Sequence, residues 1–194
     1  MKIVFFPGFP KCLSLLNEFI EEFQEKIGYV YQAKRFDQDV EAGNGKMYTL
    51  IAYSAGAIGA VSFAKKYPKR IEKIILINPA GLPKPRGVIF YRIDFLLELI
   101  KLPKDERVVV KKELEKDREA TAATTRKIVD FDLAKEIPAD LASRVCIIKS
   151  LSDSMFPPER VKQHFKEEIC LLGNGHFYLT QNAEVYVEKI KEII

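Results

Sequence analysis

The feature that most constrains the fold is a series of short, continuously apolar segments that alternate with segments of helical periodicity. Strands are expected at Lys2 to Phe6, Tyr29 to Tyr31, Met47 to Tyr53, Ile71 to Ile77, Val145 to Lys149 and Glu168 to Leu172. Apolar strands separated by helices are typical of a parallel sheet that helices cover on both faces. The sequence therefore predicts an α/β fold with about six, mostly parallel strands.

Helices are expected between these strands. Leu13 to Ile27 carries apolar residues three and four positions apart, and Gly28 follows at its end. Ala55 to Tyr67 is a run of small and apolar residues that Pro68 ends. Ligands of such sheets bind beyond the carboxyl ends of the strands. Residues that directly follow strands are therefore the candidates for a functional site.

The strand pattern stops between Asn78 and Arg144. Two segments there, Ile89 to Lys101 and Glu106 to Arg126, have helical patterns. We therefore expect a single domain over residues 1–194 with an inserted helical lid at residues 81–143. Apolar residues of this insertion either line an acyl pocket or pack the insertion on the body; they include Val88, Ile89, Phe90, Phe95, Leu96 and Leu99.

Composition and charge argue against several classes of protein. No apolar run approaches the ~20 residues needed to span a bilayer, and Pro7 cuts the apolar start before a signal-peptide core forms, so we expect a cytoplasmic protein. The net charge of +4 includes no basic block, so neither nucleic acid nor a membrane is an expected partner. Cys12, Cys146 and Cys170 form no CxxC pair, which predicts reduced thiols and neither a disulfide framework nor a metal site.

The segment from Leu50 to Ala57 joins a strand to a helix through a serine. Ala52 and Gly56 lie two residues before and after Ser54, where bulky side chains would collide with the neighbouring strand and helix. Such a tight turn forces the serine into the strained conformation that is typical of a nucleophile elbow. It also places Ser54 at a helix N-terminus, where the backbone N–H of Ala55 favours a developing negative charge. A structural turn with a capping serine is the alternative for this string taken alone.

An acid and a base follow the last two expected strands. Asp153 comes after Val145 to Lys149, and His176 lies in a glycine-lined turn after the final strand. The chain has one other histidine, His164, in a segment expected to be a surface helix. His176 is therefore the candidate base and Asp153 the group that orients it, although an Asp in an ordinary loop is the alternative for Asp153 alone.

The loop after the first strand, Phe6-Pro7-Gly8-Phe9-Pro10, can supply a second oxyanion donor. It forms a glycine turn, and the amide of Phe9 that follows the turn is the candidate donor. This loop lacks the G-x-G-x-x-G pattern of dinucleotide-binding domains, so that class is set aside.

Taken together, these residues resemble the α/β-hydrolase superfamily over essentially the whole chain. The order Ser54, Asp153, His176 is the order of its catalytic triads. The oxyanion motif of the family, similar to HGFP, corresponds here to Pro7-Gly8-Phe9-Pro10, with proline where histidine is usual. The resemblance implies an α/β-hydrolase fold with an inserted helical lid.

The implied activity is acyl transfer from a small-molecule ester or thioester through an acyl-enzyme on Ser54, with no cofactor. Lys84, Arg86 and Arg92, near the start of the insertion, suggest recognition of an acidic carrier protein or a carboxylate. The resembling family includes carrier-protein methyl ester esterases, so such an esterase is one subtype that stays open. A cofactor-free haloperoxidase or perhydrolase uses the same triad and stays open. A non-catalytic binding protein of the same fold is the competing class.

Overall fold

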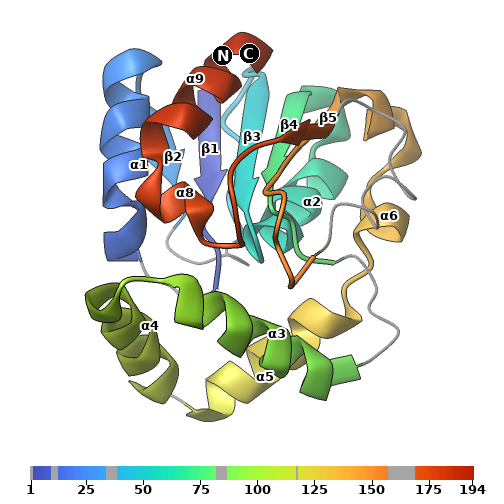
Figure 1. Ribbon diagram of the computed structural model, residues 1–194. Helices are drawn as coiled ribbons and strands as arrows, with labels where there is room; N and C mark the ends of the chain where they lie inside the picture. Colours follow the sequence, from blue (N-terminus) through green and yellow to red (C-terminus); the bar gives the residue numbers. More distant parts are fainter. Residues whose placement is uncertain (1, 10–12, 34–38, 82–86, 117, 157–168) are drawn as a thin grey trace.

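The computed structural model describes residues 2–9, 13–33, 39–81, 87–116, 118–156 and 169–194. Within them, six strands form one sheet in the order β2-β1-β3-β4-β5-β6, and every neighbouring pair is parallel (Figure 1). The strands are β1 (Lys2–Phe6), β2 (Val30–Gln32), β3 (Tyr48–Tyr53), β4 (Ile71–Ile77), β5 (Val145–Lys149) and β6 (Ile169–Leu171). The predicted α/β fold with about six strands is confirmed, and the strands are parallel throughout.

Helices cover both faces of the sheet, as predicted. On one face, α1 (Leu13–Lys26) and α9 (Ala183–Ile193) pack against alternate strand residues such as Phe5 and Ile51 (Figure 1). On the other face, α2 (Gly56–Lys66) packs against the intervening residues, including Phe6 and Leu50. The short α6 (Leu133–Glu136) joins this second core through Leu133. β3 is buried along its whole length and β4 is buried from Ile74 to Ile77, and burial on both faces is why these stretches are mostly apolar.

The strand order reverses at β1, which lies between β2 and β3. The chain leaves β1 toward one side of the sheet and leaves β3 toward the other. The connections therefore diverge at the carboxyl ends of β1 and β3, which is where ligands of such sheets bind. The loop that contains Gly8 and the turn that contains Ser54 lie at this place.

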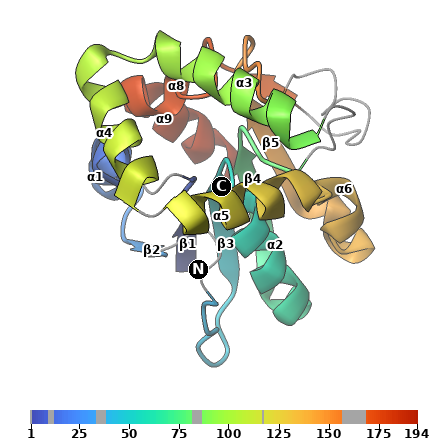
Figure 2. The same cartoon turned by 90° about the horizontal axis from the view of Figure 1, so that it is seen from below.

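Three helices lie across the carboxyl ends of the strands (Figures 1 and 2). They are α3 (Gly87–Lys101), α4 (Lys104–Lys116) and α5 (Arg118–Asp130). The segment with a helical pattern, Glu106 to Arg126, is helical in the structure and belongs to two helices, α4 and α5. One straight helix of that length would extend about 30 Å, whereas α5 packs on both α3 and α4.

The chain after the last strand forms α8 (Tyr178–Gln181) and α9, neither of which was predicted. The signal for α9 was present, because Ala183, Tyr186, Val187 and Ile190 are buried at helical spacing. Among the described residues, none of the helices has the length and apolarity required to cross a bilayer.

Candidate active site

Ser54 occupies a strained turn between β3 and α2. Its φ of +51° is unusual for a residue with a side chain, and such conformations cost on the order of 1–3 kcal/mol. The backbone N–H of Ser54 donates to the Ile77 carbonyl at 2.9 Å, and its carbonyl accepts from the Ala80 N–H at 3.0 Å. These two hydrogen bonds to β4 and to the loop that follows it therefore stabilise the strained conformation of Ser54.

Two glycines allow this turn to form. A Cβ on Gly56 would lie 2.1 Å from the Phe6 carbonyl oxygen, so only glycine lets α2 start this close to the end of β1. A Cβ on Gly8 would lie 3.1 Å from the Ser54 Cβ and 3.0 Å from Tyr53 Cδ1. Close packing thus brings the loop after β1 against the serine turn.

The side chains of Ser54, His176 and Asp153 form a continuous hydrogen-bonded chain. His176 Nε2 lies 2.8 Å from Ser54 Oγ, and His176 Nδ1 lies 2.9 Å from Asp153 Oδ2. An ionised carboxylate only accepts hydrogen bonds, so Nδ1 carries the proton that it donates to Asp153. Nε2 of the neutral ring is then free to accept the Ser54 hydroxyl proton.

Asp153 is a fully paired, buried carboxylate. Its Oδ1 accepts the backbone N–H groups of Met155 at 2.9 Å and Phe156 at 3.1 Å. Its Oδ2 accepts from His176 and from the Lys149 ammonium, which lies 2.6 Å away with no exposed side-chain surface. Burial alone would raise the pKa of Asp153, but His176 and Lys149 outweigh it and hold that pKa well below its usual range.

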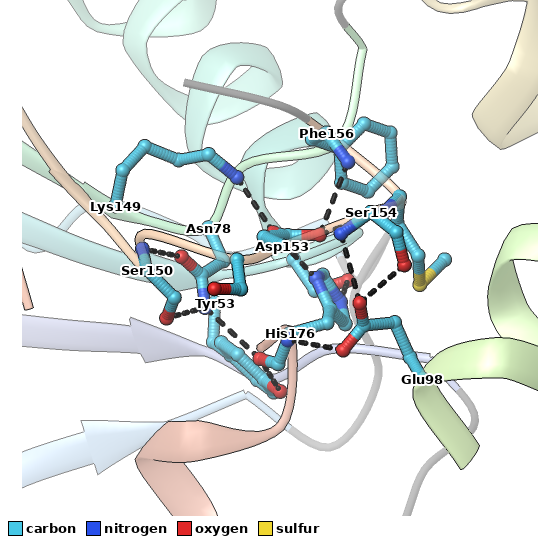
Figure 3. A network of polar contacts seen from close by, with 12 residues as sticks. Tyr53, Asn78, Glu98, Lys149, Ser150, Asp153, Ser154, Phe156 and His176 are labelled. Carbon is cyan, nitrogen blue, oxygen red and sulfur yellow. Dashed lines mark hydrogen bonds and ion pairs between the residues drawn. The ribbon is translucent and has the colours of Figure 1, made fainter. Parts of the chain in front are cut away.

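The backbone carbonyl of His176 is held by two polar side chains, one at the end of β3 and one just after β4. Its carbonyl accepts from the Tyr53 hydroxyl at 2.9 Å and from Asn78 Nδ2 at 2.9 Å (Figure 3). The Asn78 amide also bonds Ser150, through its Oδ1 to the backbone N–H and through its Nδ2 to the hydroxyl. Asn78 therefore links the loops that follow β4, β5 and β6. Its own φ of +44° is one that asparagine tolerates better than most residues.

Glu98 reaches the same loops from α3. Its carboxylate accepts the backbone N–H of His176 at 2.7 Å and that of Ser154 at 2.8 Å (Figure 3). Sequence reasoning missed both Glu98 and Lys149. Glu98 falls in the apolar stripe that contains Tyr91 and Leu102, and Lys149 ends an otherwise apolar strand. A charge in a buried pattern is rarely unpaired, so each position carried a usable signal.

The two predicted oxyanion residues lie on either side of Ser54. Ala55 follows it directly as the N-cap residue of α2, and Phe9 follows Gly8, which packs on the serine turn. Their roles as donors remain predictions. His164, Lys84 and Arg86 lie outside the described residues, as does Cys12. Among the residues that the structure places, no group of three or more His, Cys, Asp or Glu could hold a metal ion.

An apolar cavity of about 390 Å³ lies between the helices of the insertion and the loop after β1. Its walls are Phe9, Tyr91, Arg92, Phe95, Leu96, Leu99, Lys111, Leu114, Thr121 and Thr125. Phe9 and Tyr91 connect it to the cluster that contains Ala55. Of the residues considered for an acyl pocket, Phe95, Leu96 and Leu99 line this cavity, whereas Ile89 is 72% exposed. The volume is near the lower end of the range of ~300–1,000 Å³ for ligand pockets.

No known protein-family profile matches the chain, and no curated protein matches its sequence. Several solved structures are similar in fold. A lipase-esterase related protein from Clostridium acetobutylicum ATCC 824 is 18% identical with a TM-score of 0.70, covering 100% of this chain and 94% of that one. The enol-lactonase from Burkholderia xenovorans LB400 is 18% identical with a TM-score of 0.68, covering 98% and 90%.

A third similar structure is MGS-MChE2, an alpha/beta hydrolase enzyme from the metagenome of lagoon sediments at Mar Chica, Morocco. It is 19% identical with a TM-score of 0.62, covering 99% of this chain and 89% of that one. Likeness at such low identity is a likeness of fold, and it confirms the fold class that the sequence predicted.

Proposed function

Because the chain has the α/β-hydrolase fold, we propose that it is a serine hydrolase that cleaves a carboxylic ester or thioester through an acyl-enzyme on Ser54. The observation that carries the proposal is the hydrogen-bonded chain from Ser54 Oγ through both ring nitrogens of His176 to Asp153. The buried, charged Asp153 favours a proton on Nδ1, which leaves Nε2 as the base.

The reaction follows from these positions. Ser54 Oγ attacks the acyl carbon while its proton moves to His176 Nε2, and Asp153 stabilises the imidazolium that forms. The backbone N–H groups of Ala55 and Phe9 bind the oxyanion. His176 then gives the proton to the departing alkoxide or thiolate. Water activated by the same Nε2 hydrolyses the acyl-enzyme and restores Ser54.

The acyl group fits the apolar cavity between α3, α4 and α5, which makes this insertion a lid over the site. The cavity reaches Phe9, whose amide is the proposed oxyanion donor, so an acyl carbon at Ser54 would direct its chain into the cavity. Apolar walls favour a hydrocarbon chain over a polar acyl group.

Turnover of p-nitrophenyl butyrate tests the proposal. We expect the wild type to release p-nitrophenol, and Ser54→Ala and His176→Ala to lose at least ~10³-fold in kcat while staying folded. Equal activity in the folded Ser54→Ala variant would contradict it. A folded wild type without turnover of any ester in a chain-length panel would favour the non-catalytic binding protein. Peroxide-dependent halogenation in acetate would identify the perhydrolase alternative.

A second candidate within the same chemistry is hydrolysis of a monoester of a dicarboxylic acid. Arg92 and Lys111 are the two cationic members of the otherwise largely apolar cavity wall. A carboxylate at the far end of the acyl chain would pair with them. This candidate predicts that monomethyl adipate has a higher kcat/KM than methyl hexanoate, and that Arg92→Ala removes the difference.

A further inference from the structure

Glu98 is a buried charge that links the helical insertion to the loops of the candidate triad. Glu98 is only 1% exposed, although it belongs to α3 and lies outside the sheet. Oε2 accepts the backbone N–H of His176 at 2.7 Å. Oε1 accepts the backbone N–H of Ser154 at 2.8 Å and also bonds the Ser154 hydroxyl. One carboxylate therefore contacts the loop after β5 and the loop after β6.

Two neighbouring residues, Lys101 and Gly175, lie close to the Glu98 carboxylate. Lys101, one turn later on α3, donates to Glu98 Oε1 at 2.7 Å and to the Ser152 carbonyl at 3.0 Å. Gly175 has a φ of +90°, and a Cβ there would lie 2.9 Å from Glu98 Oε2. The positive φ favours glycine at this turn, and a Cβ here would require the Glu98 carboxylate to shift. The end of α3 contacts residues on both sides of Asp153 and the residue that carries the base.

We propose that Glu98 is a positioning residue, which aligns His176 with Asp153 and Ser54 only when α3 lies over the site. The proposal rests on the proposed function, since it concerns the same triad. Hydrogen bonds from backbone N–H groups to a buried carboxylate are among the strong ones in proteins. Burial raises the pKa of Glu98, but Lys101, Ser154 and the His176 N–H outweigh it and lower that pKa, so the carboxylate is ionised at neutral pH.

The arrangement couples substrate binding to alignment of the triad. Ser54 is 3% exposed and His176 is 2% exposed, so an ester reaches them only after part of their cover moves. The helix that carries Glu98 also lines the cavity with Tyr91, Phe95 and Leu99. An acyl chain that holds α3 against the body therefore also restores the contacts of Glu98 with the two loops.

Three variants separate this role from a general effect on the insertion. Glu98→Ala removes the carboxylate, and Glu98→Gln keeps its shape but places an amide N–H₂ against a backbone donor. Glu106→Gln is the matched control, because Glu106 also ties the insertion to the body. It accepts from the Thr180 hydroxyl at 3.4 Å, which joins α4 to α8, and among the described residues it has no hydrogen bond to either loop. Thermal unfolding establishes that each variant is folded.

The first readout is independent of activity. The chain has two histidines, so ¹⁵N-histidine labelling gives a simple NMR spectrum in which the protected Nδ1–H of His176 reports its bond to Asp153. We expect this proton signal in the wild type and in Glu106→Gln, and its loss through solvent exchange in both Glu98 variants. A persistent signal in a folded Glu98→Gln variant would overturn the proposal, as would equal loss in Glu106→Gln.

The second readout is the split between kcat and KM for p-nitrophenyl acetate, whose acyl group is too short to fill the cavity. We expect kcat to fall by about 10–100-fold in the Glu98 variants, the scale of a misplacement near 1 Å, with little change in KM. Unchanged kcat in both folded Glu98 variants would overturn the positioning role. If the wild type hydrolyses no ester but the NMR signal still depends on Glu98, the proposed function fails and the positioning role stands.

Discussion

Three buried charges organise the candidate site at the scale of single residues. Lys149 and Asp153 form an ion pair without exposed side-chain surface, and Glu98 is nearly as deeply buried. Asp153 and Glu98 each have several hydrogen-bond partners, and Lys149 pairs with Asp153. Such pairing is the condition under which burial of a charge is tolerated. The pairs fix the loops that carry the reactive groups.

Lys149→Met tests the ion pair. Removing the cation leaves Asp153 buried with fewer partners, so we expect the free energy of unfolding to fall by about 3 kcal/mol, measured by urea denaturation. The double variant with Asp153→Asn should lose less than the sum of the two single losses, because the unpaired charge is then gone. A Lys149→Met protein as stable as the wild type would show that the pair does not hold Asp153.

Gly56→Ala tests the close start of α2. The added Cβ would meet the Phe6 carbonyl oxygen, which is backbone and cannot rotate away. We expect a loss of about 1–3 kcal/mol or more in unfolding free energy and slower reaction at Ser54. Gly43→Ala is the control, since its Cβ would have an ordinary 3.5 Å contact with the Tyr48 hydroxyl. Equal stability of the two variants would contradict the packing argument.

The positions of Ser54, Asp153 and His176 could be predicted because each follows a recognisable strand. Parallel strands end at one edge of a sheet, so residues after different strands meet there. Glu98 and Lys149 were missed for a different reason. Their roles depend on the groups that they contact in other elements: backbone N–H groups of two loops for Glu98, and Asp153 for Lys149. Periodicity within one element does not identify these partners.

At the scale of elements, α3 has two roles in the proposed account. Through Phe95 and Leu99 it lines the cavity, and through Glu98 it contacts the triad loops. A cavity of fixed size should set an upper limit on acyl length. Each methylene that enters it should raise kcat/KM by about 4-fold, the equivalent of ~0.8 kcal/mol, until the cavity is full.

Thr125→Leu tests the cavity as the acyl site. Thr125 on α5 is 7% exposed and lines the cavity, so the larger side chain should fill part of it. We expect the optimum in a series of p-nitrophenyl esters to move to shorter chains, with acetate turnover unchanged. Ala123→Leu, at an exposed position on the same helix, should leave the series unaltered. An unchanged optimum in Thr125→Leu would place the acyl chain elsewhere.

Elements with long or regular patterns were predictable, and their ends and turns were less so. All six strands and the helices α1, α2 and α3 were expected near their observed places. The division of this segment into α4 and α5 was not predicted, because polar residues at Lys116 and Arg118 fit the exposed face of one helix as well as the ends of two. Only packing against α3 distinguishes the two cases.

At the scale of the whole molecule, the buried carboxylates predict loss of stability in acid. The folded-state pKa values of Asp153 and Glu98 are lowered, below the ~4 of unfolded carboxyl groups. Their contribution is therefore present above that pH and is lost as the pH falls through the folded values. We expect the unfolding free energy to decrease below about pH 5, less steeply in Glu98→Gln. A stability that is flat down to pH 3 would contradict the prediction.

Intact mass after treatment with a small fluorophosphonate is the most direct test of a nucleophilic Ser54. The account predicts one adduct on the wild type, no adduct on Ser54→Ala and almost none on His176→Ala, with all three proteins folded. One adduct of equal yield on folded Ser54→Ala, or no adduct on a wild type whose cavity is shown to admit the probe, would contradict the account.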